Sequence, residues 1–288
     1  MRFGKLLVVA ALLAAGPAAA RFEIGYYDHA GTTRVAEMAA AGVTLLIAYL
    51  PATTDPKPLL DEAQRRGMGV ALQVEPRLPP GSDDLGAVAA LVTGSRRHPA
   101  LRAWYAFDEP EQKLPARRVG EVVGLIRRLD PEHPVLTVHS VDPRAPAFAG
   151  FGDIVGMDYY PVTSQAPLSR SLDLVVGFSE QLLGWVKGRP RLTLFVVQAF
   201  SWKDVIACPA CRFPAAAELR YLVYAPLVTG VDAIAFWARY RTPDAEWRDT
   251  VAPLVRELRA LRPSLERNAA GQLARPAPTV RQAGVGAG

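Results

Sequence analysis

Eight short apolar segments recur along the chain, and stretches with a helical spacing of apolar residues lie between them. The apolar segments are 22–27, 44–49, 69–74, 101–107, 135–138, 154–157, 192–197 and 233–237. The stretches with apolar residues three and four positions apart are 33–41, 59–66, 87–96, 117–129, 172–187, 215–229 and 244–261. Only the connection between the fifth and sixth segments lacks a clear helix, because 143–148 is long enough for a short turn at most. The pattern predicts strands that alternate with helices.

This alternation favours one parallel sheet covered by helices, because each crossover has to return the chain to the same edge. Strands buried on both faces read as continuous apolar runs, as LTLFVV and VLTV do. Eight such units in about 250 residues match a closed (β/α)8 barrel, the TIM barrel. A doubly wound open sheet is the alternative, but GYYDHAGTT is a poor version of the glycine-rich loop after its first strand. No repeat or linker divides residues 21–263, so we expect a single barrel domain.

The two ends of the chain differ from this region. Arg2 and Lys5 precede an apolar run at 6–15, and the alanines at 18–20 are small residues that a signal peptidase accepts. We therefore predict a cleaved secretory signal at 1–20 and a secreted or periplasmic protein. An uncleaved anchor is the alternative, although the apolar run is too short to span a bilayer. Residues 264–288 are rich in Pro, Gly and Ala, which predicts a disordered tail.

The charge of the chain argues against nucleic acid as a partner. Residues 1–20 carry two basic and no acidic residues, so their removal lowers the formal net charge from +5 to +3. The arginines are scattered through the helical stretches and form no basic stripe, so we expect no nucleic-acid binding. We also expect no membrane association once the signal is cleaved. Nothing in the sequence indicates an oligomeric state.

The two cysteines, Cys208 and Cys211, lie together in CPAC. In an exported chain this spacing favours a local disulfide that fixes a loop. A zinc site would need two more soft ligands, and none lies nearby. The sequence contains no phosphate-binding loop, dinucleotide fingerprint or metal-ligand cluster, so we expect neither a metal nor a cofactor.

Polar and aromatic side chains gather where the predicted strands end, which is where (β/α)8 barrels carry their catalytic groups. Aromatic rings stack on the apolar face of a sugar, while acids bind hydroxyls or move protons. The candidate catalytic residues are Asp108, Glu109 and Asp158, and the candidate substrate-binding residues are Tyr27, Tyr49, Glu75, His139, Tyr160, Gln198, Trp202 and Trp237. These residues predict a carbohydrate substrate or ligand. For His139 the alternative is a structural hydrogen-bonding role.

Glu109 is the strongest single candidate because of the stretch AWYAFDEPE. It follows a buried strand, and Pro110 blocks further sheet pairing. A carboxyl held there against Trp104, Tyr105 or Trp237 would be partly desolvated, which raises its pKa and suits it to donate a proton to a glycosidic oxygen. The alternative is a solvated loop that opens before the next helix.

These motifs resemble those of the clan A glycoside hydrolases. AWYAFDEPE resembles the fourth-strand motif, in which an Asn-Glu-Pro sequence carries the acid/base glutamate, and DIVGMDYYPV is similar to the sixth strand. FEIGYYD and AAAGVTLLIAYLP resemble the first two strands, and RFPAAAELRYLVYAPLVTGVDAIAFWARY resembles the seventh helix and eighth strand. The resemblance covers residues 22–262. It implies a glycosidase that cleaves an oligo- or polysaccharide, with Glu109 as acid/base and Trp237 as the residue that stacks on the sugar.

Two residues depart from the clan's pattern. Asp108 stands where the clan has asparagine, and the seventh strand ends in Gln198 where retaining members have the nucleophilic glutamate. Because an amide cannot act as a carboxylate nucleophile, the usual double displacement is not expected.

Four interpretations remain open. The first is inversion, with Glu109 as acid and Asp158 or Glu75 activating water. The second is substrate assistance, in which Asp108 polarises an acetamido group of the substrate. The third is a covalent route through another carboxylate. The fourth is a barrel that binds glycan without cleaving it.

Overall fold

The computed structural model describes residues 22–29, 31–79, 81, 83–163, 168–189 and 191–269. Within these ranges the chain forms a closed barrel of eight parallel strands in the order of the sequence. The expected (β/α)8 fold is confirmed. The predicted signal at 1–20 lies outside the described residues, as does the part of the predicted tail from residue 270 onward.

Each strand of the barrel corresponds to one of the apolar segments of the sequence. The strands are β1 (Ile24–His29), β2 (Leu45–Tyr49), β3 (Gly69–Gln73), β4 (Leu101–Asp108), β5 (Val135–His139), β6 (Ile154–Tyr159), β7 (Leu192–Gln198) and β8 (Ala233–Trp237). All neighbouring pairs are parallel, including β1 with β8, which closes the barrel. The carboxyl ends of the strands therefore share one rim.

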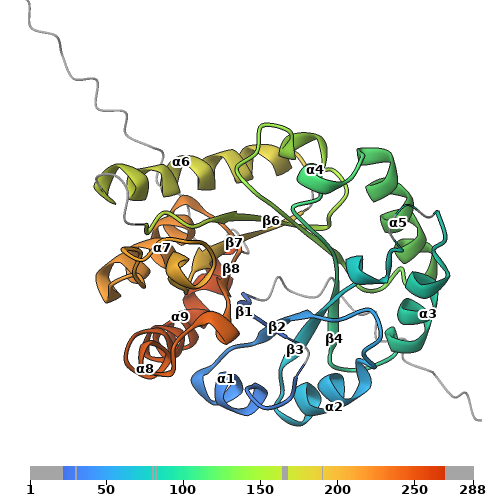
Figure 1. The fold of residues 1–288 in the computed structure, drawn as a ribbon, viewed down its shortest axis with the longest axis horizontal. Coiled ribbons are helices and arrows are strands. Elements are labelled where there is room, and N and C mark those ends of the chain that lie inside the picture. The colour runs from blue at the N-terminus through green and yellow to red at the C-terminus, as the bar shows by residue number, and fades with distance from the viewer. Residues whose placement is uncertain are drawn as a thin grey trace, which may run out of the picture.

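Helices surround the barrel on its outside (Figure 1). They are α1 (Val35–Ala41), α2 (Lys57–Arg65), α3 (Gly86–Ser95), α4 (Pro110–Lys113), α5 (Ala116–Leu129), α6 (Leu168–Val186), α7 (Ala216–Thr229), α8 (Asp244–Glu246) and α9 (Ala252–Ala269). The last helix, α9, continues to Ala269, past residue 264, where the predicted tail begins. No helix in the described ranges is long and apolar enough to cross a membrane.

Two apolar cores follow from the alternation of side chains along each strand. One fills the barrel, and the other lies between the sheet and the helices. The neighbours Trp104 and Tyr105 show the division: Trp104 packs in the outer core, where its Nε1 donates to Asp130 at 2.8 Å, and Tyr105 points into the barrel. Adjacent residues of a strand face opposite sides of the sheet, so this division was expected for the pair.

The seam between β1 and β8 depends on two small residues that face the barrel interior. Gly25 pairs with Ala235 across the seam. A Cβ added at Gly25 would lie 2.9 Å from the Cβ of Ala235, closer than two such carbons approach in folded proteins. The absence of a side chain at Gly25 therefore allows the last strand to close against the first.

We expect Gly25→Ala to destabilise the protein by about 1–3 kcal/mol, because the extra methyl overpacks the closing seam. The free energy of unfolding from denaturant titration measures this loss. The control is Gly184→Ala in α6, where an added Cβ would meet nothing within 4 Å. That variant should be neutral or gain up to about 1 kcal/mol from higher helix propensity. A Gly25→Ala variant as stable as the native chain would contradict the role of the seam.

Candidate functional site

A pocket of about 410 Å³ opens at the carboxyl ends of the strands. Eight of the residues predicted from the sequence line it: Tyr27, Tyr49, Asp108, Glu109, Asp158, Tyr160, Trp202 and Trp237. The prediction missed six further lining residues: Val138, Ser140, Val141, Tyr159, Phe200 and Val205. Among the described lining residues there is no Lys, Arg or His. The wall of the pocket is therefore made of aromatic rings, three carboxyl groups and a few small or apolar side chains.

The backbone at the end of β4 turns sharply at Glu109. This residue adopts the left-handed conformation (φ 49°, ψ 53°), and α4 begins directly after it at Pro110. The Glu109 amide donates to the carbonyl of Val138 at 2.8 Å, which ties the turn to β5. A left-handed conformation at a residue with a side chain costs about 1–2 kcal/mol, and such costs concentrate at functional sites. The turn brings the half-buried Glu109 to the wall of the pocket.

Asp108 is held by a chain of hydrogen bonds that crosses the pocket. The Tyr49 hydroxyl donates to Oδ2 of Asp108 at 3.0 Å, and Nε1 of Trp237 donates to the Tyr49 oxygen at 2.9 Å. Lys113 donates to the main-chain carbonyl of Asp108 at 2.6 Å. The indole of Trp237 and the carboxyl of Asp108 are thus fixed relative to each other through Tyr49.

The three carboxyl groups of the pocket share a partly desolvated space, and their pKa values rise. Burial, followed by the negative charges of Asp108 and Glu111, raises the pKa of Glu109 to about 7. Burial, followed by the charges of Glu109 and Asp108, raises the pKa of Asp158 well above its usual range. Burial also raises the pKa of Asp108. Because the ionised forms repel one another, ionising all three groups at once is unfavourable.

His139 does not line the pocket: it faces the layer between the sheet and the helices, where its ring centroid lies 6.1 Å from that of Trp185 in α6. The ring is fully buried, with Nδ1 2.9 Å from Oε2 of Glu111 and Nε2 3.0 Å from the Thr137 hydroxyl. Ser140 donates to Oε1 of the same glutamate through its amide at 2.8 Å and its hydroxyl at 3.0 Å. The predicted sugar contact of His139 is therefore corrected: both ring nitrogens already have partners inside the protein, as its structural alternative required.

Glu111 is a buried acid to which the sequence prediction gave no role. Burial alone would raise its pKa, but the hydrogen bonds from His139 and Ser140 outweigh that effect and lower the pKa. Glu111 therefore places a negative charge behind Glu109, and its charge contributes to the raised pKa of Glu109. Its position in AWYAFDEPE, two residues after Glu109, was the only signal in the sequence.

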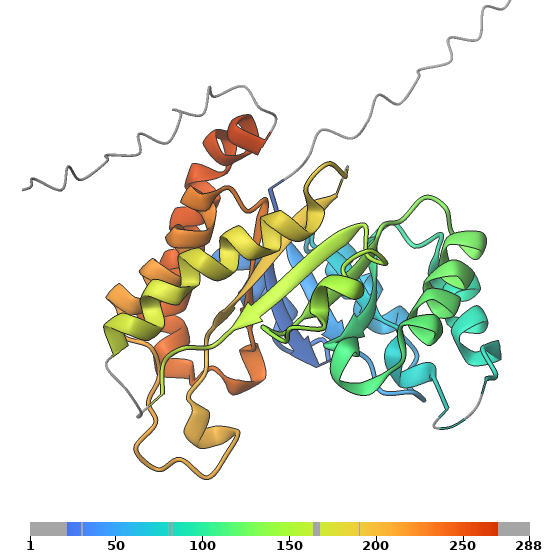
Figure 2. The ribbon, with the colours of Figure 1, turned by 90° about the horizontal axis from the view of Figure 1, so that it is seen from above.

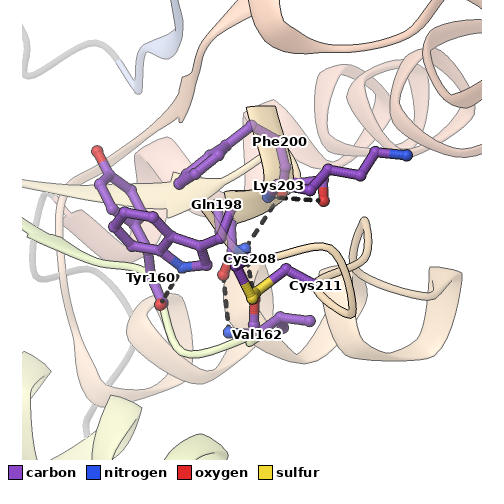
Figure 3. The surroundings of a disulfide bond; sticks show 9 residues. Tyr160, Val162, Gln198, Phe200, Lys203, Cys208 and Cys211 are labelled. Atoms are coloured by element: carbon purple, nitrogen blue, oxygen red, sulfur yellow. Dashed lines mark hydrogen bonds between the residues drawn. A yellow bond between two sulfur atoms is a disulfide. The ribbon is translucent and has the colours of Figure 1, made fainter. Parts of the chain in front are cut away.

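Gln198 is also absent from the pocket wall. Its amide oxygen accepts from the Val162 amide at 2.8 Å, and its amide nitrogen donates to the carbonyls of Val162 and Phe200 at 2.9 and 3.2 Å. Figure 3 shows this pairing with Val162 beside the disulfide. Because the side chain is fully buried and its amide is engaged, the predicted sugar contact is corrected to a bond between β7 and the segment after β6.

Glu75 likewise does not line the pocket. It begins a short 3-10 helix after β3, accepts from the Asp108 amide at 3.2 Å and lies 3.5 Å from Nζ of Lys113. This carboxylate therefore supports the main chain at the end of β4, and its contact with a substrate stays a prediction.

Aromatic rings form one side of the pocket, around Trp237. Tyr160 stacks on Trp237 with ring centroids 5.7 Å apart, and Phe200 packs edge-on against it at 4.7 Å. Trp202 packs against Phe200 at 5.0 Å and donates to the carbonyl of Tyr160 at 3.2 Å. The peptide bond after Trp237 is cis. Rigid aromatic faces of this kind suit the apolar face of a sugar ring.

The disulfide expected from CPAC is present between Cys208 and Cys211, with Cα atoms 5.4 Å apart. It lies in the segment between β7 and α7 that also carries Trp202. Within the described part of the chain, no group of three or more His, Cys, Asp or Glu side chains is arranged to hold a metal ion.

The raised pKa of Glu109 should make the stability of the protein depend on pH. The ordinary pKa of this group is 4.5, so between about pH 4.5 and 7 the folded chain holds a proton that the unfolded chain has lost. This contribution to stability is complete below pH 4.5 and disappears as the pH rises through 7. As the pH rises from 4.5 to 8, the native chain loses this stability and Glu109→Gln does not. The free energy of unfolding of Glu109→Gln should therefore rise relative to that of the native chain by about 1–2 kcal/mol over this range, after allowance for solvent screening.

Denaturant titrations at several pH values measure this difference. Glu132→Gln, at an exposed position outside the pocket, is the control and should follow the native chain. Parallel pH profiles for Glu109→Gln and the native chain would contradict a raised pKa at Glu109.

Comparison with known proteins gives matches of fold but not of sequence family. No protein-family model matches the chain, and no curated protein matches it. The β-galactosidase of the psychrophilic Marinomonas ef1 superposes with a TM-score of 0.65 at 11% identity, over 88% of this chain and 62% of that one. The β-galactosidase of Rahnella sp. R3 superposes with a TM-score of 0.64 at 12% identity, over 87% of this chain and 57% of that one. The β-glucuronidase of an uncultured Clostridium sp. superposes with a TM-score of 0.57 at 15% identity, over 83% of this chain and 50% of that one.

The chain thus spans from half to less than two thirds of the length of these proteins. Identities of this size show likeness of fold alone. The protein shares with them the fold of a closed (β/α)8 barrel.

Proposed function

We propose that this chain hydrolyses a glycosidic bond of a carbohydrate, with Glu109 as the general acid. The observation that carries the proposal is the position of Glu109: it ends β4 at the barrel rim, lines an aromatic-walled pocket and has a pKa of about 7. A carboxyl with that pKa is still protonated at mildly acidic to neutral pH. It can therefore give its proton to the leaving oxygen as the bond breaks.

Asp158, at the end of β6, is the proposed base of an inverting reaction. It lines the same pocket, and burial, followed by the charge of Glu109, raises its pKa, so that it binds a proton more readily than an ordinary aspartate. In the reactive form Glu109 is protonated and Asp158 is ionised. Asp158 accepts a proton from water, the water oxygen bonds to the anomeric carbon, and Glu109 protonates the departing oxygen. The two carboxyls end with their protonation states exchanged, and solvent restores them.

The role of Asp108 depends on the substrate. It is fixed by the hydrogen bond from Tyr49 and lies beside Glu109 in the chain. In the inverting reaction it binds a sugar hydroxyl and its charge keeps the pKa of Glu109 high. For a substrate with an acetamido group, the same carboxylate would polarise that group for substrate-assisted cleavage.

The proposed ligand and location follow from the same features. Trp237, Tyr160 and Trp202 provide aromatic faces for a sugar ring. Export is proposed from the predicted signal at 1–20, and a disulfide between Cys208 and Cys211 is compatible with an oxidising compartment.

A barrel that binds glycan without cleaving it is the second candidate. The observation that favours it is Gln198, which ends β7 with its amide engaged by main-chain groups and supplies no carboxylate there. In this case Glu109 and Asp158 would be hydrogen-bonding partners of sugar hydroxyls.

A panel of aryl glycosides and polysaccharides separates the two candidates. β-Galactosides and β-glucuronides come first, because the proteins of similar fold are β-galactosidases and a β-glucuronidase. The native chain should release product, with the rate falling as the pH rises above about 7 because Glu109 loses its proton. Glu109→Gln should lose about 10²–10⁴-fold in kcat, the usual contribution of a general acid, and should still bind the ligand.

Glu132→Gln serves again as the matched control and should retain the native rate. For a substrate that is cleaved, proton NMR of the first product formed gives its anomeric configuration, and inversion supports Asp158 as the base. Binding without turnover by both the native chain and Glu109→Gln would overturn hydrolysis in favour of the glycan-binding barrel.

A further inference from the structure

Two valines that line the pocket are partly exposed, and the isoleucine that follows one of them in the chain is exposed too. Val141 is 38% exposed, Val205 is 37% exposed and Ile206 is 55% exposed. Val141 and Val205 line the pocket itself, and Ile206 follows Val205 in the chain. We call these three residues the apolar lip. Exposed apolar groups gathered at one place commonly mark a binding surface, whereas single ones do not.

The lip is built from two loops that approach the pocket from different strands. Val141 follows β5, and Val205 and Ile206 lie between β7 and α7. Figure 2 shows the segment between β7 and α7 projecting beyond the ends of the strands. Val141 and Val205 thus belong to the same pocket as the three carboxyl groups.

The longer loop is fixed at several points, so its apolar side chains are held outward by the structure. The Ile206 amide donates to the carbonyl of Trp202 at 2.9 Å, and Arg241 donates to the carbonyl of Asp204. The disulfide closes the loop two residues after Ile206, and Arg212 pairs with Glu218 through bonds of 2.6 and 2.7 Å. A loop with so many attachments presents a preformed surface, which reduces the entropy lost on binding.

The side chains of the lip do not suit a further sugar ring. Valine and isoleucine carry no hydrogen-bonding group for hydroxyls and no flat face for stacking. Trp202, the nearest aromatic residue of the loop, packs edge-on against Phe200 and belongs to the pocket wall. Branched aliphatic side chains are instead stabilised when an apolar group covers them and removes their surface from water.

We propose that the apolar lip binds an apolar group attached to the sugar, so that the substrate is an aryl or alkyl glycoside. This inference rests on the proposed function, because it assigns the part of the substrate that leaves with the glycosidic oxygen. The sugar occupies the aromatic and carboxyl part of the pocket, and the apolar group lies against Val141, Val205 and Ile206.

Binding of methyl and octyl β-glycosides tests the proposal directly. The sugars are glucose, galactose, glucuronic acid and N-acetylglucosamine, titrated below the micelle concentration into Glu109→Gln so that no ligand is cleaved. For at least one sugar the octyl glycoside should bind at least about tenfold more tightly than the methyl glycoside. Val205→Ser with Ile206→Ser should reduce this ratio to about threefold or less. Val141→Ser, on the other loop, should lower it independently.

Val228→Ser is the matched control for non-specific adsorption of the alkyl chain. Val228 is the more exposed valine, at 86%, and lies on α7 outside the pocket. This variant should keep the full octyl preference. The proposal is overturned if no sugar shows an octyl preference, or if the preference persists in the lip variants.

Two further measurements complete the test. Sedimentation distinguishes a substrate contact from a contact between two copies of the chain, and a turnover assay distinguishes binding from cleavage. If sedimentation shows a dimer of the native chain that dissociates in the Val205→Ser, Ile206→Ser variant, the lip is a contact between two copies and the proposal fails. Turnover by the native chain is measured on the same glycosides. Turnover without a preference for octyl glycosides would contradict the role of the apolar lip and leave the proposed hydrolysis standing. A preference for octyl glycosides without turnover would contradict the proposed hydrolysis and leave the role of the lip standing.

Discussion

Repulsion between carboxyl groups in a shielded pocket is the interaction on which the proposed chemistry depends. Asp108, Glu109 and Asp158 line the same pocket. The nearby ammonium of Lys113 is bonded to the carbonyl of Asp108 and pairs with Glu75. Ionising all three carboxyls at once is therefore unfavourable, and the pKa of Glu109 rises to about 7. A proton held at neutral pH beside an ionised partner is the condition that acid-base cleavage requires.

Barrel closure produces this crowding. Because all eight described strands run parallel, residues at the ends of β4 and β6 meet at one rim although they are far apart in sequence. The turn at Glu109 is held by β5, whose Val138 carbonyl accepts its amide, and is followed by the buried Glu111, which pairs with His139. Ser140 lines the pocket and also bonds to Glu111, so it joins this pair to the pocket wall.

The sequence was sufficient to predict the parts of this arrangement that depend on periodicity. Apolar runs predicted the strands, and the residues at the end of each run or just after it predicted which side chains reach the rim, as with Trp237 and Glu109. It was insufficient where a side chain finds its partner in a distant loop. Gln198 and His139 end their strands as expected. The side chain of Gln198, however, is hydrogen-bonded to main-chain groups after β6, and that of His139 to the carboxylate of Glu111. Such pairings depend on loop conformations, and loops show no periodic spacing of apolar residues from which their conformation could be predicted.

The most direct test of the account is the pKa of Glu109 itself. A carboxyl ¹³C NMR titration of protein labelled at glutamate, with the signal assigned from Glu109→Gln, measures it. The account predicts a pKa near 7, which falls when Asp108→Asn removes a neighbouring negative charge. A pKa near 4.5 that does not respond to that substitution would contradict the claim that this group holds a proton for catalysis.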